Sequence, residues 1–85
     1  MNKGYIYILK SLKDAKSYVG STNDLTRRIG EHNTGKCKST KARIPMELVY
    51  MEEYDTLGEA RKRERFLKTT SGRRVLKKIF QNIGP

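Results

Sequence analysis

Two short β-strand patterns joined by a turn-length segment constrain the fold of this chain more than any other feature. The stretches "GYIYILK" at 4–10 and "KSYVG" at 16–20 are rich in the β-branched and aromatic residues that favour strands. The polar "SLKDA" between them leaves room only for a turn, so we expect a β-hairpin. With the turn centred on residues 12–13, Tyr7 would lie opposite Tyr18, with both side chains on one face of the sheet.

The segments that follow predict three helices and one more strand. A cluster of Ser, Thr, Asn and Asp is suited to begin the first helix, and Asn33 and Gly35 are suited to end it. Asp55 or Thr56 can cap the second helix, and Ser71 can cap the third. We therefore expect a strand at 46–54 and helices at about 24–32, 55–68 and 72–83.

The order ββαβαα predicts an α+β fold in which helices flank a three-stranded antiparallel sheet. A chain of 85 residues has the size of one domain, so we expect a single domain over 1–85. Alternation along the third strand predicts one face with Leu48, Tyr50 and Glu52 and another with Val49 and Met51.

The chain is strongly basic, with 19 Lys and Arg against 9 Asp and Glu and a net charge of +10. Clustered positive charge of this density indicates a polyanionic partner, either nucleic acid or an anionic membrane. No expected helix joins a clean basic face to large apolar anchors, which favours DNA over a membrane. The contacts we expect are mainly to the phosphate backbone. The expected DNA-binding residues, in the loop after the first helix and on the third helix, are Lys36, Lys38, Lys41, Arg43, Arg73, Arg74, Lys77 and Lys78.

The cysteine content and the hydropathy pattern indicate the cellular compartment. No signal-peptide pattern precedes the first strand, and the longest apolar run is too short to cross a membrane. The lone Cys37 cannot form an internal disulfide. We therefore expect the reducing environment of the cytoplasm.

Two polar side chains lie on the core-facing stripe of the first expected helix. Arg28 and His32 share helical spacing with Leu25 and Ile29. His32 could be a half-buried histidine bonded to backbone, and Arg28 could extend its charged head to water. The same spacing would also serve a functional site, and the pattern leaves both alternatives open.

A carboxylate interrupts the core-facing arc of the second expected helix. Glu64 shares that arc with Leu57 and Leu67. Because desolvating an unpaired charge costs several kcal/mol, Glu64 must be protonated, paired, at a sheet edge or beside a bound cation. An ion pair with Arg61 or Lys68 on the same helix is one explanation, and a functional carboxylate is the other.

These polar exceptions to the core pattern would together suit phosphodiester hydrolysis. A carboxylate such as Glu64 can hold a divalent metal through oxygen. A tyrosine hydroxyl can help to deprotonate water, and Arg28 can clamp phosphoryl oxygens as charge develops on them. The candidate set is Tyr7, Tyr18, Arg28, His32 and Glu64.

The same residues carry a resemblance to a known family. The motifs "YIY" at 5–7 and "YVG" at 18–20, Arg28 ten positions beyond Tyr18, and the glutamate in "RERFLK" resemble the GIY-YIG nucleases. That family includes homing endonucleases and the N-terminal domain of an excinuclease subunit. The resemblance covers nearly the whole chain, and "HNTGKCKSTKARIP" and "TSGRRVLKK" look like its small stand-alone bacterial members.

The resemblance implies the predicted fold and assigns roles to particular side chains. Tyr7 and Tyr18 would both lie at the active site, where one of them, commonly taken to be Tyr7, acts as general base or positions the attacking water. Arg28 matches the phosphate-stabilising arginine. His32 matches a position that often carries a histidine or tyrosine of the catalytic site.

The resemblance also implies a metal and a structural glycine. Glu64 matches the sole protein ligand of a single Mg²⁺ or Mn²⁺. Gly20 would let the second strand turn into the first helix.

The chain departs from the family pattern at two places. Tyr5 replaces the glycine of the first motif, with Gly4 one position early, a change that the small stand-alone members tolerate. Larger members carry an asparagine after the glutamate, where this chain reads Leu76-Lys77-Lys78. The missing asparagine therefore weakens the prediction of activity more than the prediction of the fold.

The leading function is a metal-dependent endonuclease that hydrolyses DNA phosphodiester bonds, with a role in DNA repair or recombination. The alternative is a non-catalytic nucleic-acid-binding module of the same fold. An interaction or membrane-surface protein is a third, poorer alternative. In the leading case, the basic loop and the basic face of the third helix would straddle the DNA backbone.

Overall fold

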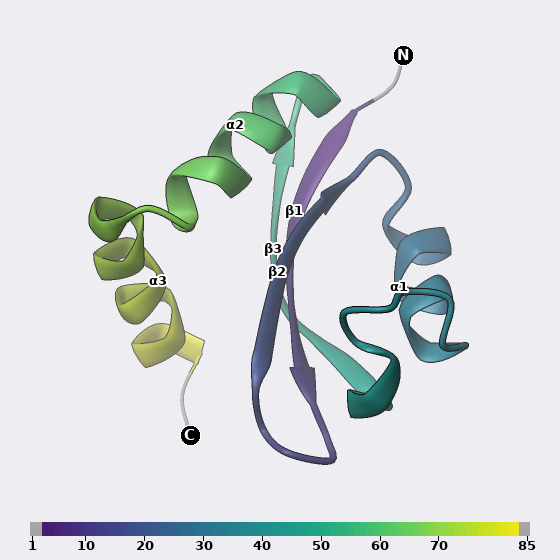
Figure 1. Ribbon diagram of the computed structural model, residues 1–85. Coiled ribbons are helices and arrows are strands. Elements are labelled where there is room, and N and C mark those ends of the chain that lie inside the picture. The colour runs from purple at the N-terminus through teal and green to yellow at the C-terminus, as the bar shows by residue number, and fades with distance from the viewer. Residues whose placement is uncertain (1–2, 84–85) are drawn as a thin grey trace.

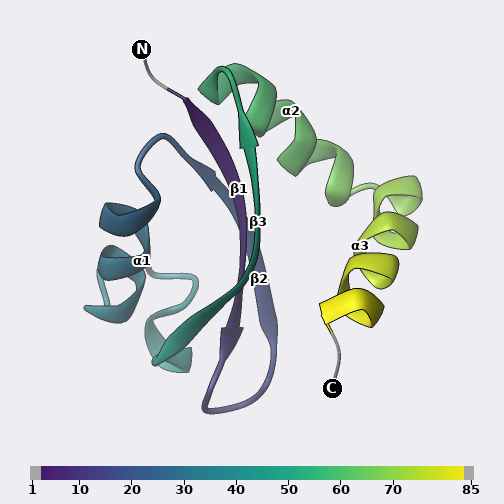
Figure 2. The same ribbon diagram turned by 180° about the vertical axis from the view of Figure 1, so that it is seen from behind.

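A computed structural model describes residues 3–83, in which one antiparallel sheet carries helices on both faces (Figure 1). The strands follow the spatial order β2-β1-β3, and the chain order ββαβαα is as expected, with a short 3₁₀ helix added before β3. The elements are β1 Gly4–Ser11, β2 Ser17–Thr22, α1 Leu25–Asn33, the 3₁₀ helix Lys41–Arg43, β3 Met46–Tyr54, α2 Leu57–Leu67 and α3 Thr70–Ile83. Helix α1 covers one face of the sheet and α2 and α3 cover the other, as the front and back views agree (Figures 1 and 2).

The central strand β1 is buried on both faces. Ile6, Tyr7, Ile8 and Leu9 each expose 1% of their surface or less. Tyr7 and Leu9 pack toward α1, while Ile6 and Ile8 alternate to the face of α2. A strand covered on both sides needs a continuous apolar run, which explains why "YIYIL" shows no polar alternation.

The hairpin register differs from the expected one. Tyr18 pairs with Leu9, and Tyr7 pairs with Gly20 rather than with Tyr18. The turn is centred one residue later than expected, on residues 13–14, and in it the Ser11 hydroxyl accepts hydrogen bonds from the backbone of Lys13 and Asp14. The two tyrosines still share one face as diagonal neighbours, with ring centroids 6.3 Å apart.

A β-bulge changes the faces of β3. Leu48 pairs with Leu9 but Tyr50 pairs with Ile8, so Val49 is an extra residue in the ladder. Because paired residues share a face, Tyr50 lies on the opposite face from Leu48. The expected common face for Leu48, Tyr50 and Glu52 is therefore wrong.

The bulge brings a half-buried polar cluster under α2. Glu52 accepts hydrogen bonds from the hydroxyls of Tyr50 and Tyr54, at 2.6 and 2.7 Å, and from Arg63 of α2. Burial by itself would raise the pKa of Glu52, but the hydrogen bonds from Arg63 and the tyrosines outweigh it and leave the pKa below its usual value. The ionised carboxylate thus ties α2 to β3.

Side-chain caps begin all three α-helices. Asp24 accepts from the Arg27 amide at the start of α1, and Thr56, one of the two residues expected there, caps α2. The cap of α3 is Thr69, whose hydroxyl accepts from the amide of Gly72 at 3.1 Å. The expectation for Ser71 is wrong because α3 begins earlier, at Thr70. Within residues 3–83, no helix is both long enough and apolar enough to span a bilayer.

Candidate active site around Tyr7 and the edge strand

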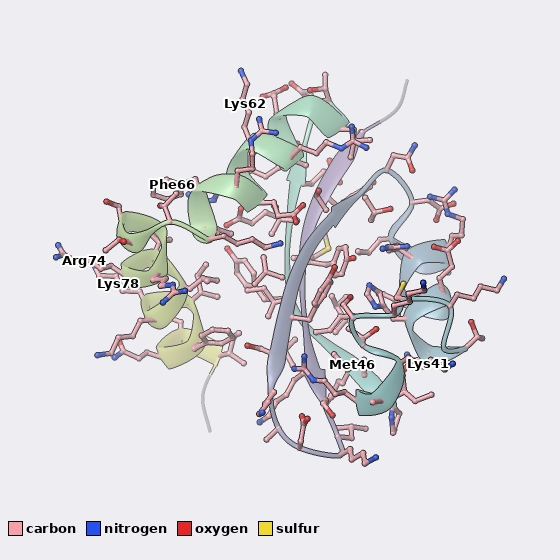
Figure 3. All side chains as sticks on the ribbon, in the orientation of Figure 1. Lys41, Met46, Lys62, Phe66, Arg74 and Lys78 are labelled. Carbon is pink, nitrogen blue, oxygen red and sulfur yellow. The ribbon has the colours of Figure 1, made fainter. Side chains whose placement is uncertain are left out.

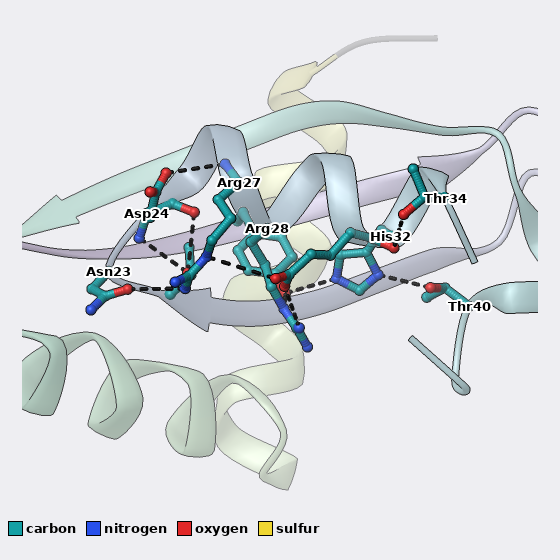
Figure 4. A network of polar contacts seen from close by, with 10 residues as sticks. Asn23, Asp24, Arg27, Arg28, His32, Thr34 and Thr40 are labelled. Carbon is teal, nitrogen blue, oxygen red and sulfur yellow. Dashed lines mark hydrogen bonds and ion pairs between the residues drawn. The ribbon is translucent and has the colours of Figure 1, made fainter. Parts of the chain in front are cut away.

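A buried tyrosine, a buried histidine and an arginine meet between β1 and α1 (Figure 4). The hydroxyl of Tyr7 lies 2.9 Å from Nε2 of His32 and receives a longer, 3.4 Å hydrogen bond from Nε of Arg28. Tyr7 is 1% exposed and His32 is fully buried. Successive turns of α1 place Arg28 and His32 on the same side, which is why their spacing with the apolar stripe was informative.

Tyr18 completes an aromatic cluster at this point. Its ring centroid lies 5.0 Å from that of His32, and Tyr7 and His32 meet edge to face at 5.6 Å. The hydroxyl of Tyr18 makes no hydrogen bond within the described part of the chain, and the side chain is only half-buried. Tyr18 therefore offers the more accessible hydroxyl of the pair.

Gly20 makes room for the Tyr7 ring. A Cβ at this position would lie 2.5 Å from Cζ of Tyr7 and closer still to its hydroxyl. Gly20 lies inside β2, which continues to Thr22, so the expected role in turning the strand into the helix is wrong. The glycine is needed because the ring of its strand partner crosses over it.

Burial determines the protonation states of the cluster. Desolvation raises the pKa of Tyr7 to about 12, although the Arg28 hydrogen bond acts in the opposite direction. Burial, and next the charge of Arg28, lower the pKa of His32 below its usual value. Hydrogen bonds to Tyr7 and to Glu31 raise the pKa of Arg28. At neutral pH the cluster is a protonated tyrosine, a neutral imidazole and a guanidinium.

Two partners of this cluster were not found from the sequence. Thr40 places its hydroxyl 2.7 Å from Nδ1 of His32, and Glu31 pairs with Arg28 at 3.0 Å. The spacing of Glu31, three residues after Arg28 on one helix, is a signal that could have identified it. Thr40 lies in an irregular basic loop where no periodicity reports burial, and only the folded chain shows it.

Glu64 lies across the edge strand from the tyrosines. It projects from α2, accepts a hydrogen bond from the Ser21 hydroxyl of β2, and pairs with Lys68 at 2.7 Å. The Lys68 ammonium also lies 5.9 Å from the centroid of the Tyr18 ring. Both explanations for Glu64 are therefore compatible with the structure. The ion pair on the helix forms, and the carboxylate also lies at the sheet edge near the aromatic cluster, where it could serve a functional site.

The donor set at Glu64 is compatible with one hard divalent cation. Within residues 3–83 no group of three His, Cys, Asp or Glu side chains could enclose a metal, so Glu64 would have to share it with water and substrate oxygens. The Glu64 side chain is 23% exposed, and its carboxylate already pairs with one cation, the Lys68 ammonium. A carboxylate with a neighbouring hydroxyl is a donor set that Mg²⁺ accepts.

A shallow basic pocket of about 250 Å³ lies at the end of β2. Its side chains come from the end of β2, the start of α1 and the first turns of α2. They include three arginines and no carboxylate among the described lining residues, which suits an anion such as a backbone phosphate. The lining residues are Ser21, Thr22, Asn23, Arg27, Arg28, Leu57 and Arg61.

The expected DNA-binding residues fall into two separate groups. Lys36, Lys38 and Lys41 are exposed on the loop beside α1, whereas the basic residues of α3 lie beyond the opposite face of the sheet (Figures 1 and 2). Figure 3 shows Arg74 pointing away from the sheet. Arg43 differs from the other loop residues, because its guanidinium pairs with Asp14 at 3.5 Å and holds the loop against the hairpin turn.

The basic residues of α3 are all exposed to solvent. Arg73, Arg74, Lys77 and Lys78 all lie on α3, and their charged heads are not drawn into the core. A single phosphate could not contact both groups, because the sheet stands between them (Figure 1). Contact of both groups with DNA would require a duplex that passes around an edge of the sheet.

The fold and the residues around β2 define a GIY-YIG domain. The model of the GIY-YIG catalytic domain matches residues 3–79, and the chain belongs to this family. A UPF0213 protein of Staphylococcus saprophyticus is 49% identical over 82 residues, which is 95% of this chain and 99% of the relative. A UPF0213 protein of Staphylococcus epidermidis is 45% identical over 80 residues, covering 93% and 96% of the two chains.

A solved relative supports the architecture. The solution NMR structure of the UPF0213 protein BH0048 from Bacillus halodurans superposes with a TM-score of 0.58 at 36% identity. The match covers 98% of this chain and 88% of that one. The expected α+β fold is thereby confirmed.

Proposed function

We propose that this protein is a divalent-metal-dependent endonuclease that hydrolyses phosphodiester bonds in DNA. The observation that carries the proposal is the Tyr7 hydroxyl, which contacts a neutral histidine and a permanently charged arginine at once. A structural tyrosine needs only one partner. A tyrosine between a proton acceptor and an anion-stabilising cation is equipped to move a proton beside a phosphate.

In this proposal the side chains between β1 and α1 activate water. Neutral His32 can take the proton of the Tyr7 hydroxyl as Tyr7 takes a proton from the attacking water. The raised pKa of Tyr7 makes a free tyrosinate rare at neutral pH, so transfer through His32 is the more favourable route. The hydroxyl of half-buried Tyr18 would orient the water.

Arg28 would stabilise the charge that develops on the phosphoryl oxygens. The Arg28 side chain is one third exposed and lines the basic pocket, so a phosphate in that pocket could reach it. Loss of one such contact typically lowers the rate by about 10²–10³-fold.

Glu64 would hold the divalent cation, with the Ser21 hydroxyl beside it. When bound, such a cation supplies Lewis-acid stabilisation of phosphoryl and leaving-group oxygens. Lys68 would have to release the carboxylate, and its ammonium would then be free to contact phosphate. The proposed cofactor is a single Mg²⁺ or Mn²⁺.

The exposed lysines of the loop beside α1 would supply most of the binding free energy through phosphate contacts. Such binding depends on salt and selects DNA shape rather than base sequence. Replacing Lys36, Lys38 and Lys41 together by glutamine should lower the slope of log K against log salt by about 3. An unchanged slope would remove the loop from the interface.

The test of the activity is nicking of supercoiled and branched DNA with Mg²⁺ or Mn²⁺ and then with EDTA. Glu64→Gln keeps the shape of the side chain and should abolish metal-dependent nicking. Glu47→Gln is the matched control, because Glu47 is an exposed carboxylate on β3 away from the cluster. Equal nicking by the Glu64 variant and the wild type would point to a contaminating nuclease and refute the assignment.

One observation favours a second candidate, a nucleic-acid-binding module without turnover. The Lys68 ion pair and the Ser21 hydrogen bond explain the position of Glu64 without a metal. DNA binding without cleavage of any substrate by wild-type protein in either metal would select this candidate. Metal-dependent nicking would exclude it.

A further inference from the structure

We infer that Thr40 is the positioning residue of the Tyr7–His32 pair, because it holds the imidazole in the tautomer whose Nε2 accepts the tyrosine proton. Thr40 is fully buried, although it lies in the basic loop among exposed lysines. Its hydroxyl points into the protein, toward Nδ1 of His32 (Figure 4). The inference deepens the proposed function and rests on it for its catalytic meaning.

The hydrogen bonds around Tyr7 indicate which tautomer of His32 is present. Arg28 has no acceptor, so its Nε can only donate to the Tyr7 oxygen. The single proton of Tyr7 is then directed to Nε2 of His32, at 2.9 Å. A neutral imidazole that accepts at Nε2 carries its proton on Nδ1. The Thr40 oxygen, 2.7 Å away, is the acceptor for that proton.

The same hydroxyl assists the proton transfer. When His32 takes a second proton at Nε2, both ring nitrogens become donors. The Thr40 oxygen still accepts from Nδ1–H, so the imidazolium keeps a partner inside the protein. Without it, a charged ring would bury an unsatisfied donor, which costs free energy.

The backbone around Thr40 holds the hydroxyl in place. The Thr40 amide donates to the Cys37 carbonyl at 3.1 Å, and the Thr40 carbonyl accepts from the Arg43 amide at 2.9 Å. Arg43 in turn pairs with Asp14 on the hairpin. The loop that carries the proposed phosphate-binding lysines is therefore also the segment that orients His32.

Three variants separate this role from a general effect on folding. Thr40→Val keeps the shape of the side chain and removes the hydroxyl. Thr40→Ser restores the hydroxyl on a smaller side chain. Ser39→Ala is the matched control, because it removes an exposed hydroxyl from the same loop.

The ¹⁵N chemical shifts of the imidazole ring report the tautomer directly, and His32 is the only histidine of the chain, so its signals need no further assignment. We expect the wild type, Thr40→Ser and Ser39→Ala to show a protonated Nδ1 and an unprotonated Nε2. Thr40→Val should shift the population toward a protonated Nε2. In the nicking assay kcat should fall about 10–100-fold for Thr40→Val with KM unchanged, and Thr40→Ser should recover most of it.

Two results would overturn the inference. One is a wild-type ring protonated on Nε2, and the other is a Thr40→Val variant whose ring shifts and kcat match those of the wild type. If the wild type cuts no DNA, the proposed nuclease function fails, but the ring shifts still decide whether Thr40 sets the tautomer. The failures of the two proposals are therefore distinguishable.

Discussion

Replacing Gly20 by alanine tests whether the Tyr7 ring sets the size limit at this position of β2. The new Cβ would lie 2.5 Å from Cζ of Tyr7. Since carbon atoms pack best about 3.5 Å or more apart, the ring would have to move by roughly 1 Å. It cannot move freely, because His32 and Tyr18 pack around it.

The expected cost follows from two opposing effects. Overpacking of this kind destabilises a core by about 1–3 kcal/mol. Alanine has less conformational freedom than glycine in the unfolded chain, which stabilises the folded state by about 0.4–1 kcal/mol. This gain applies here because Gly20 does not have a positive φ, so alanine can adopt its backbone conformation. We expect a net loss of about 1–2 kcal/mol, or roughly 4–16 °C in Tm for a domain of this size. In the proposed enzyme, a displacement of the Tyr7 hydroxyl by about 1 Å would also lower kcat by about 10²-fold.

The assay is urea unfolding of the variant in two backgrounds, wild type and Tyr7→Leu. Removal of the tyrosine ring should make Gly20→Ala neutral or stabilising, which a double-mutant cycle measures as coupling. Gly30→Ala is the control, since Gly30 lies on the exposed side of α1 and an added Cβ meets nothing within 4 Å. That change should stabilise the protein by up to about 1 kcal/mol. An equal loss from Gly20→Ala in both backgrounds would refute the role of the Tyr7 ring.

Three further predictions concern the corner of α3 and the cluster under α2. Thr69→Ala should lower the free energy of unfolding by about 1 kcal/mol, because it removes the cap of α3. Ser71→Ala should change it by less than about 0.5 kcal/mol. The reverse order in urea unfolding would show that Ser71 is the cap. Gly72→Ala should destabilise the protein by about 3 kcal/mol or more, because the new Cβ would clash with the backbone of Phe66, which cannot move away as a side chain can. An unchanged Tm would contradict this contact. The lowered pKa of Glu52 implies stability that is present above the ordinary carboxyl value of about 4.3 and is lost as pH falls through the lowered value. Glu52→Gln should therefore be less stable at pH 7 and lose less stability than the wild type on acidification, and parallel pH profiles would disprove it.

Local patterns were sufficient for the elements and their order. Strand formers in "YIYIL" and a cap at Asp55 or Thr56 depend on a few neighbouring residues, so they could be recognised without the fold, and the structure selects Thr56. The same holds for Arg28 and His32, since residues three and four apart on a helix share a face whatever it packs against. The net charge of +10 likewise needs no structure.

Other features depend on contacts between distant segments. The hairpin register follows from the Ser11 turn, and the faces of β3 follow from the bulge at Val49, neither of which strand propensity reports. Arg43 resembled its basic neighbours in the sequence, yet in the fold it pairs with Asp14.

The sequence by itself determined which elements form, which residues carry charge, and which polar side chains share helical faces with the core. Only the tertiary structure decided that Gly20 accommodates the Tyr7 ring, that Thr40 reaches His32, and that Glu64 meets Ser21 across the edge of the sheet. The physical reason is the sequence separation over which each kind of interaction acts. Propensity, capping and charge act over one or two turns of chain, whereas these three contacts join residues 13, 8 and 43 positions apart and form only when the sheet and helices have packed.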